Sequence, residues 1–89
     1  MSNKRKTEGN RMVKKGTIGI PQDGRMTACS YCIKHFEEGS IFGIDGGRIS
    51  KLTIKIDGKI TCCYDRGWDE EPEDDATKAA LAILIREYN

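Results

Sequence analysis

The chain has 89 residues, of which 33% are charged and 37% are hydrophobic, and its formal net charge is +1. A chain of this length forms one small domain, and it contains no apolar run near the ~18 residues of a membrane span. The net charge excludes a global field that attracts nucleic acid, but the charges are segregated along the chain. Basic residues gather in 4–15 and acidic residues in 65–75. We therefore expect a soluble, strongly dipolar domain that has no membrane contact.

Residues 1–12 are polar and charged, and they lack the apolar segment of a signal peptide. We expect a disordered basic tail over 1–12 and a single α+β domain over 13–89. The tail is either simply solvated or an arm that contacts phosphates. The absence of an export signal predicts a cytoplasmic protein whose four cysteines are free thiols.

Two strands are predicted in the first half of the domain. Val13–Ile20 has a weak strand pattern, and the Pro-Gln-Asp-Gly sequence of 21–24 is typical of a tight turn. Arg25–Phe36 is predicted as the second strand, although both of its faces carry apolar or small residues. We expect the face of Tyr31 and Ile33 to be the core face.

A glycine-rich loop is predicted over 37–47, where four glycines occur. The loop also contains Ile41, Phe42 and Ile44, and we expect these apolar side chains to fold back onto the sheet. The glycine pair at its end predicts a bulge or a turn with positive φ.

The clearest strand is Arg48–Ile56. Apolar side chains such as Leu52 and Ile54 share one face, and Lys51 and Lys55 share the other, which is typical of a half-buried antiparallel strand. The strand Ile60–Asp65 is expected to return beside it.

The turn between these strands decides which faces meet. A two-residue Asp57-Gly58 loop places the apolar side chains of the returning strand on the lysine face. A three-residue loop that includes Ile56 pairs Ile54 with Ile60 and Leu52 with Cys62, which brings both apolar sets to one face. Because burial sets the register, we predict the three-residue loop.

A single helix is predicted over Glu73–Tyr88, with Pro72 at its first position and acidic residues in its first turn. Its apolar stripe consists of Thr77, Leu81, Leu84, Ile85 and Tyr88, widened by Ala76, Ala80 and Ile83. We expect the helix to cover the face of Leu52, Ile54 and Ile60. The predicted fold is therefore α+β, a three- or four-stranded antiparallel β-meander with one C-terminal helix packed on one face.

The sequence contains no recognisable catalytic, cofactor or metal site. Cys29 and Cys32 are three residues apart on a predicted strand and point to opposite faces, and the adjacent Cys62 and Cys63 also diverge, which argues against zinc. His35 has no evident nucleophile or metal partner. The loop glycines lack the Gly-Lys-Ser/Thr of a phosphate loop. We predict a non-enzymatic protein without cofactors.

Two charged surfaces are candidate contacts for a partner. Lys51 and Lys55, with Arg48 nearby, form a basic stripe on the exposed strand face. The acidic cluster of 65–75 either caps the helix or attracts a basic partner. Arg48 and Arg66 are also predicted to form an arginine–carboxylate network under Trp68. The candidate partner-binding residues are Arg48, Lys51, Tyr64, Asp65, Arg66, Trp68, Asp69, Glu70 and Glu71.

Two strings carry a family resemblance: GIDGGRISKL over 43–52 and YDRGWD over 64–69, with Gly39-Ser40 before them and Pro72 after. They resemble an uncharacterised family of small proteins from Gram-positive bacteria and their phages and mobile elements. The resemblance covers roughly 25–88 and implies a mobile-element setting but no activity. By analogy with small proteins of such elements, we expect a non-enzymatic protein that binds a host protein or complex, for example an anti-CRISPR-type inhibitor of host defence. The alternative is a small nucleic-acid-binding module that uses the basic arm and the lysine-bearing strand face. The oligomeric state stays open.

Overall fold

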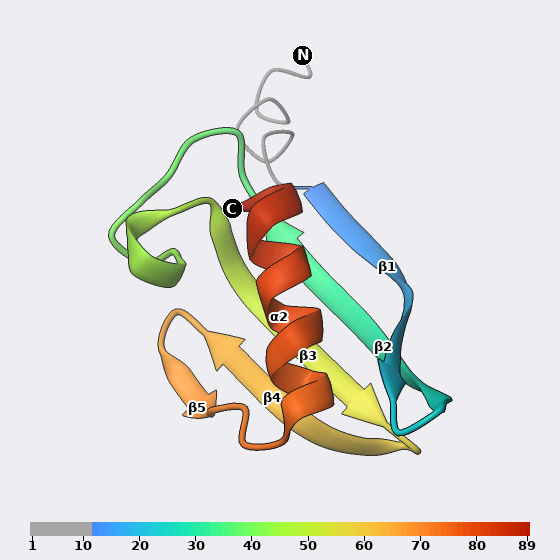
Figure 1. Cartoon of the computed structure of the whole chain (residues 1–89). Coiled ribbons are helices and arrows are strands. Elements are labelled where there is room, and N and C mark those ends of the chain that lie inside the picture. Colours follow the sequence, from blue (N-terminus) through green and yellow to red (C-terminus); the bar gives the residue numbers. More distant parts are fainter. Residues whose placement is uncertain (1–11) are drawn as a thin grey trace.

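The computed structural model describes residues 12–89, which form one antiparallel sheet with a helix lying across one of its faces (Figure 1). The five strands follow one another in space in the order β1-β2-β3-β4-β5. Their bounds are Met12–Gln22 for β1, Arg25–His35 for β2, Ile49–Ile56 for β3, Lys59–Asp65 for β4 and Trp68–Glu70 for β5; η1 spans Ile44–Gly46 and helix α2 spans Asp75–Tyr88. The predicted α+β meander with a C-terminal helix is confirmed, with one strand more than expected. The predicted basic tail, 1–12, lies outside the described residues except for Met12, which is the first residue of β1.

The two long hairpins both turn on an Asp-Gly pair. Asp23 and Gly24 have φ values of 44° and 78°, and Asp57 and Gly58 have φ values of 53° and 78°. Two consecutive residues with positive φ define the two-residue turn that suits the right-handed twist of a hairpin. The predicted three-residue loop at Asp57 is therefore wrong, and Ile56 pairs directly with Lys59.

The apolar faces of β3 and β4 nevertheless meet, because a register shift lies inside the strand pair rather than at the turn. Lys55 pairs with Ile60, but the next pair is Ile54 with Cys62, and Leu52 follows opposite Tyr64. One extra residue of β4 is thus absorbed as a bulge. The predicted pairs of Ile54 with Ile60 and Leu52 with Cys62 are wrong, and Ile60 stays 50% exposed. Burial sets the register, but the bulge lets the Asp-Gly turn keep its own geometry.

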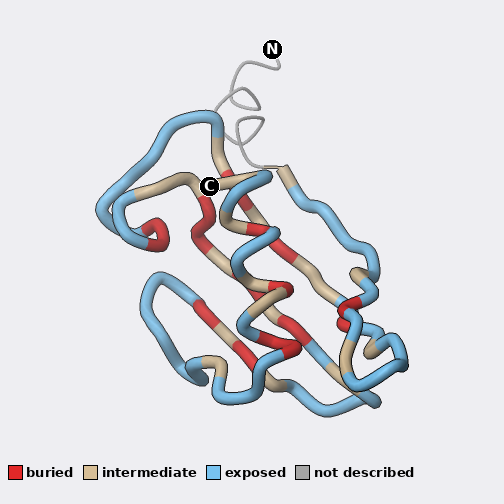
Figure 2. The backbone as a smooth tube through the Cα atoms, viewed as in Figure 1, coloured by how far each residue is buried: buried red, intermediate tan, exposed pale blue. Residues whose placement is uncertain are grey.

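The core lies between the sheet and α2 (Figure 2). The predicted core face of β2 is confirmed, since Ile33 is fully buried while Met26, on the opposite face, is exposed. Of the three apolar side chains that were expected to fold back from the loop after β2, only Ile44 is buried. Ile41 and Phe42 are 88% and 51% exposed, so the expectation that they cover the sheet is wrong. The buried apolar residues are Ile20, Cys29, Ile33, Ile44, Ile49, Leu52, Ile54, Cys62, Tyr64, Ala76, Ala80 and Leu84.

Helix α2 begins later than predicted. Asp74 is the N-cap, and its Oδ2 accepts a hydrogen bond of 2.9 Å from the backbone N–H of Thr77. Pro72 therefore precedes the helix instead of opening it. The buried Thr77 hydroxyl lies 2.7 Å from Asp74 Oδ1 and 2.8 Å from the hydroxyl of Thr61 on β4, which joins the helix start to the sheet. Burial raises the pKa of Asp74, but the hydrogen bonds from Thr77 outweigh it and lower that pKa.

Ile83, which was expected to widen the apolar stripe of α2, is exposed. The buried part of the stripe consists of Ala76, Thr77, Ala80 and Leu84. Across 12–89, no helix is long and apolar enough to cross a membrane.

Candidate functional site

Within residues 12–89, one face of the sheet has no covering layer, because α2 packs on the other (Figure 1). Side chains alternate between the two faces, so the neighbours of the buried Ile33 and Leu52 point to the open face. The strand register arranges them in three rows: Val13, Lys34, Lys51 and Asp65; Lys15, Cys32, Thr53 and Cys63; and Thr17, Ser30, Lys55 and Ile60. Four lysines thus share this open face with small side chains at its centre and with the half-exposed Val13 and Ile60.

Two lysines of the open face, Lys34 and Lys51, lie directly opposite each other. Lys34 and Lys51 are direct cross-strand partners, which places their backbones about 5 Å apart. Lys51 and Lys55 are four residues apart on β3, so they are separated by about 13 Å. Two like charges directly opposite each other destabilise a sheet by roughly 0.2–1 kcal/mol. The ion pair between Lys51 Nζ and Asp65 Oδ2 measures 3.8 Å and is half-exposed, so it offsets only part of that cost.

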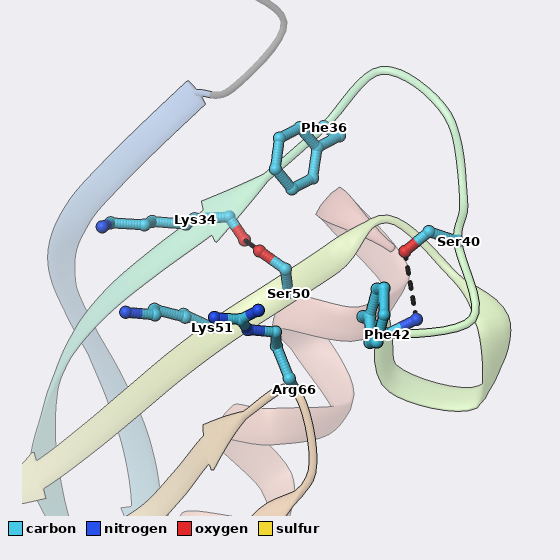
Figure 3. Close-up of a pocket in the computed structure, with 7 residues that line it drawn as sticks. All are labelled: Lys34, Phe36, Ser40, Phe42, Ser50, Lys51 and Arg66. Carbon is cyan, nitrogen blue, oxygen red and sulfur yellow. Dashed lines mark hydrogen bonds between the residues drawn. The ribbon is translucent and has the colours of Figure 1, made fainter. Parts of the chain in front are cut away.

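A pocket of about 270 Å³ opens at the end of the open face where β2 leaves the sheet (Figure 3). It is lined by Lys34, Phe36, Ser40, Phe42, Ser50, Lys51 and Arg66. The pocket therefore combines three cations and two aromatic rings, which come from β2, from the loop after β2, from β3 and from the β4–β5 turn.

Arg66 is positioned by its backbone. Its φ of 60° lies in the left-handed region, which costs a non-glycine residue roughly 1–2 kcal/mol. Its N–H donates to the carbonyl of Ser50 on β3 at 3.0 Å. The guanidinium carbon then lies 6.0 Å from the centroid of the Phe42 ring, at the outer limit of a cation–π contact.

The loop that carries the aromatic rings, residues 36–48, is tied down at several points. The Tyr64 hydroxyl donates to the carbonyl of Phe42 at 2.9 Å. The Asn89 amide accepts a hydrogen bond of 2.8 Å from the N–H of Ile49 and donates one of 3.0 Å to the carbonyl of Ile44. Gly43 passes so close to the carbonyl of Gly47 that a Cβ there would overlap it. The pocket wall is therefore preformed.

A second hollow, of about 290 Å³, lies farther along the open face. It is lined by Lys15, Ser30, Tyr31, Cys32, Thr53 and Lys55. Its Cys32 and Thr53 are cross-strand partners, and so are Lys34 and Lys51 in the first pocket, two residues farther along the same strands. The two hollows therefore follow one another along β2 and β3, and each is lined by lysines.

The sequence-predicted partner-binding residues fall into three groups. Lys51, Asp65 and Arg66 come together on the open face, where Arg66 Nε lies 4.0 Å from Asp65 Oδ1. Arg48 does not join them, because its Nε donates to the backbone carbonyl of Asn89 at 3.4 Å. The predicted network of both arginines under Trp68 is therefore wrong.

The other predicted residues lie at or beyond the last strand. Tyr64 is buried on the helix face of β4, and Trp68 packs edge-on against it with ring centroids 4.9 Å apart. Asp69 and Glu70 are exposed on β5, and Glu71 is exposed just after it. These acidic side chains form the outer edge of the sheet.

Sequence reasoning missed Lys15, Lys34, Phe36 and Phe42. Lys34 occupies the face of β2 opposite Ile33, just as Lys51 and Lys55 occupy the face of β3 opposite the core. That alternation is the one signal in the sequence for Lys34. The two phenylalanines lie at the start of the loop and within it, and no local pattern places them beside β3.

The four cysteines divide between the two faces and are free thiols. Cys29 and Cys62 lie in the core, where burial raises the pKa of both thiols, that of Cys62 to about 12. Cys32 and Cys63 lie on the open face with Thr53 between them. Within residues 12–89, no three His, Cys, Asp or Glu side chains gather in a way that could hold a metal ion.

His35 is a buried titratable group near the pocket. Neither ring nitrogen has a hydrogen-bond partner among the described residues, and its ring centroid lies 5.2 Å from that of Tyr88. Burial lowers the pKa of His35, and the nearby charges of Arg48 and Lys14 lower it further. The imidazole is therefore neutral in the folded protein at neutral pH.

These features define an α+β domain with one helix-covered face and one open, cationic face that ends in an aromatic pocket. The chain belongs to the family described as a domain of unknown function, DUF7678, whose model matches residues 12–89. Comparisons with curated proteins and with solved structures found no match. The family description carries no organism, so the resemblance to small proteins of Gram-positive bacteria and their phages stays a prediction.

Proposed function

We propose that this domain binds nucleic acid on the open face of its sheet. The observation that carries the proposal is the direct pairing of Lys34 with Lys51 at the pocket end of a face that also presents Lys15 and Lys55. The repulsion between these lysines destabilises the free domain. An anionic polymer that binds there relieves the repulsion, and the free energy released adds to its affinity. The geometry of the open face thus favours the nucleic-acid-binding module over the binder of a host protein, the other function expected from the sequence.

The low net charge of the chain does not oppose this function, because most of the acidic cluster lies away from the open-face lysines, with Asp65 as the exception. The acidic residues of 69–75 lie on β5, on the segment before α2 and at the first residue of α2. Because the side chains of Cys32 and Thr53 are small, the centre of the open face is recessed. A phosphodiester backbone can therefore approach the sheet between the lysines. The basic arm of the sequence prediction lies outside the described residues.

The test is a fluorescence anisotropy titration with labelled DNA and RNA at about 50 and 200 mM salt. Lys34→Gln and Lys51→Gln each remove one phosphate contact and should weaken binding several-fold. Each should also reduce the slope of log K against log salt by about 0.7 for a single strand or 0.9 for a duplex. Lys78→Gln, which removes an exposed lysine on α2, is the matched control and should change neither quantity. No binding at low salt, or an equal effect of Lys78→Gln, contradicts the proposal.

A second candidate function rests on β5, which is a short edge strand with exposed residues. Trp68 on this strand is 39% exposed, and an edge strand beside an aromatic side chain suits a protein partner. The hypothesis of a phage or mobile-element protein that acts on a host protein, for example as an anti-CRISPR-type inhibitor, rests on this edge. Asp69→Lys with Glu71→Lys should abolish capture of a stoichiometric host partner and leave nucleic-acid affinity intact or tighter. Capture that survives this double reversal contradicts the hypothesis.

A further inference from the structure

The pocket at the end of the open face has a composition that the lysines alone do not explain. Phe42 is 51% exposed although it is a large apolar side chain on a loop that is tied down on both sides. Phe36 lines the same hollow from the end of β2 (Figure 3). An exposed aromatic ring held in place beside cations is the arrangement that single-stranded nucleic-acid binders use to stack bases.

The fixed backbone of the pocket supports a binding role for the ring and for Arg66. The carbonyl of Phe42 is held by Tyr64, and the N–H of Phe42 donates to the Ser40 hydroxyl at 3.1 Å. Arg66 keeps a left-handed backbone conformation that places its guanidinium over the Phe42 ring. Strained residues of this kind cluster at binding sites, where pre-organisation repays their cost.

We propose that this pocket takes one unpaired base of a single-stranded nucleic acid against the ring of Phe42, with the adjacent phosphates on Lys34, Lys51 and Arg66. The inference rests on the proposed function and narrows it to single strands. A duplex keeps its bases stacked inside and presents only their edges. It can therefore bind the lysines, but its bases cannot stack on the Phe42 ring in the pocket. Stacking on a base and contacts to phosphates do not distinguish one base from another. The domain should therefore prefer single strands over duplexes without preferring a particular base sequence.

The experiment compares a labelled single strand of about 12 nucleotides with a duplex of the same length. The native protein should bind the single strand about tenfold tighter or more. Phe42→Leu keeps an apolar side chain of similar size but removes the π face, and it should weaken single-strand binding by about fivefold to a hundredfold. Its affinity for the duplex and its salt slope should not change. Phe42→Trp should restore or exceed native binding.

Ile41→Ala is the matched control, since Ile41 is the neighbouring exposed apolar residue and does not line the pocket. It should bind both probes as the native protein does, and circular dichroism should show every variant folded. If Phe42→Leu binds single strands as tightly as the native protein, or if the native protein prefers the duplex, the inference is overturned while the lysine results still support the function. If the native protein binds neither probe at low salt, both the inference and the proposed function fall.

Discussion

Asp65 offers the sharpest test of the open face, because it places a negative charge beside two of its cations. Its two carboxylate oxygens lie 3.8 Å from Lys51 Nζ and 4.0 Å from Arg66 Nε. A phosphate that binds Lys51 and Arg66 must compete with this carboxylate. We predict that Asp65→Asn tightens binding to nucleic acid. The second candidate function instead predicts weaker capture of the protein partner by Asp65→Asn, since Asp65 is then part of the acidic surface that the partner contacts.

The size of the gain follows from two terms. A phosphate on Lys51 lies about 8 Å from the Asp65 carboxylate, and at the dielectric constant of water their repulsion is about 0.5 kcal/mol. The half-exposed ion pairs that must be broken contribute roughly 0.2–1 kcal/mol. The sum, about 0.7–1.5 kcal/mol, corresponds to an affinity gain of about threefold to twelvefold at low salt. The gain should shrink near physiological salt, where the screening length is about 8 Å.

The assay is the same anisotropy titration, with thermal unfolding as a check on the fold. Glu87→Gln removes one exposed negative charge from α2 and should leave the affinity unchanged, so it separates a local effect from a change in net charge. An unchanged or weaker affinity of Asp65→Asn refutes the reasoning. An equal gain from Glu87→Gln would mean that only the net charge matters.

Three further substitutions test the elements that support the site. Burial lowers the pKa of His35 below its ordinary 6.5. Its contribution to stability is therefore complete above pH 6.5 and is lost as the pH falls through the folded pKa. His35→Phe keeps a ring against Tyr88 and should remove this loss of stability in acid. Thermal unfolding at about pH 5 and pH 7 measures it, and a pH dependence equal to that of the native protein contradicts the prediction. Thr77→Val removes the hydroxyl bond to Asp74 and should cost about 1–2 kcal/mol, or roughly 5–10 °C in Tm. A native-like melt would refute that role. Gly43→Ala introduces a Cβ against a loop carbonyl, so it should destabilise the domain and weaken single-strand binding; full binding would show that the loop is not preformed.

The local pattern of the chain was enough to predict β1 to β4, helix α2 and most of the faces that they bury. Lys51 and Lys55 alternate with Leu52 and Ile54, and because the period of a strand is two, this alternation assigns them to opposite faces before any neighbour is known. The stripe of α2 and the core face of β2 follow from the same kind of local periodicity.

The binding site itself depends on contacts between segments far apart in the chain. The register shift near Ile54 was decided by which arrangement buries the β4 side chains, and a turn sequence does not encode that choice. Lys34 meets Lys51 only through cross-strand pairing, and Phe42 meets Arg66 only because the loop after β2 and the β4–β5 turn reach the same end of the sheet. The sequence by itself thus determined the alternation within a strand, such as Lys51 against Leu52, but not the exposure of Ile60 or Phe42. Only the tertiary structure decided which side chains are neighbours, because pairing and loop placement minimise the free energy of the whole sheet rather than of any one segment.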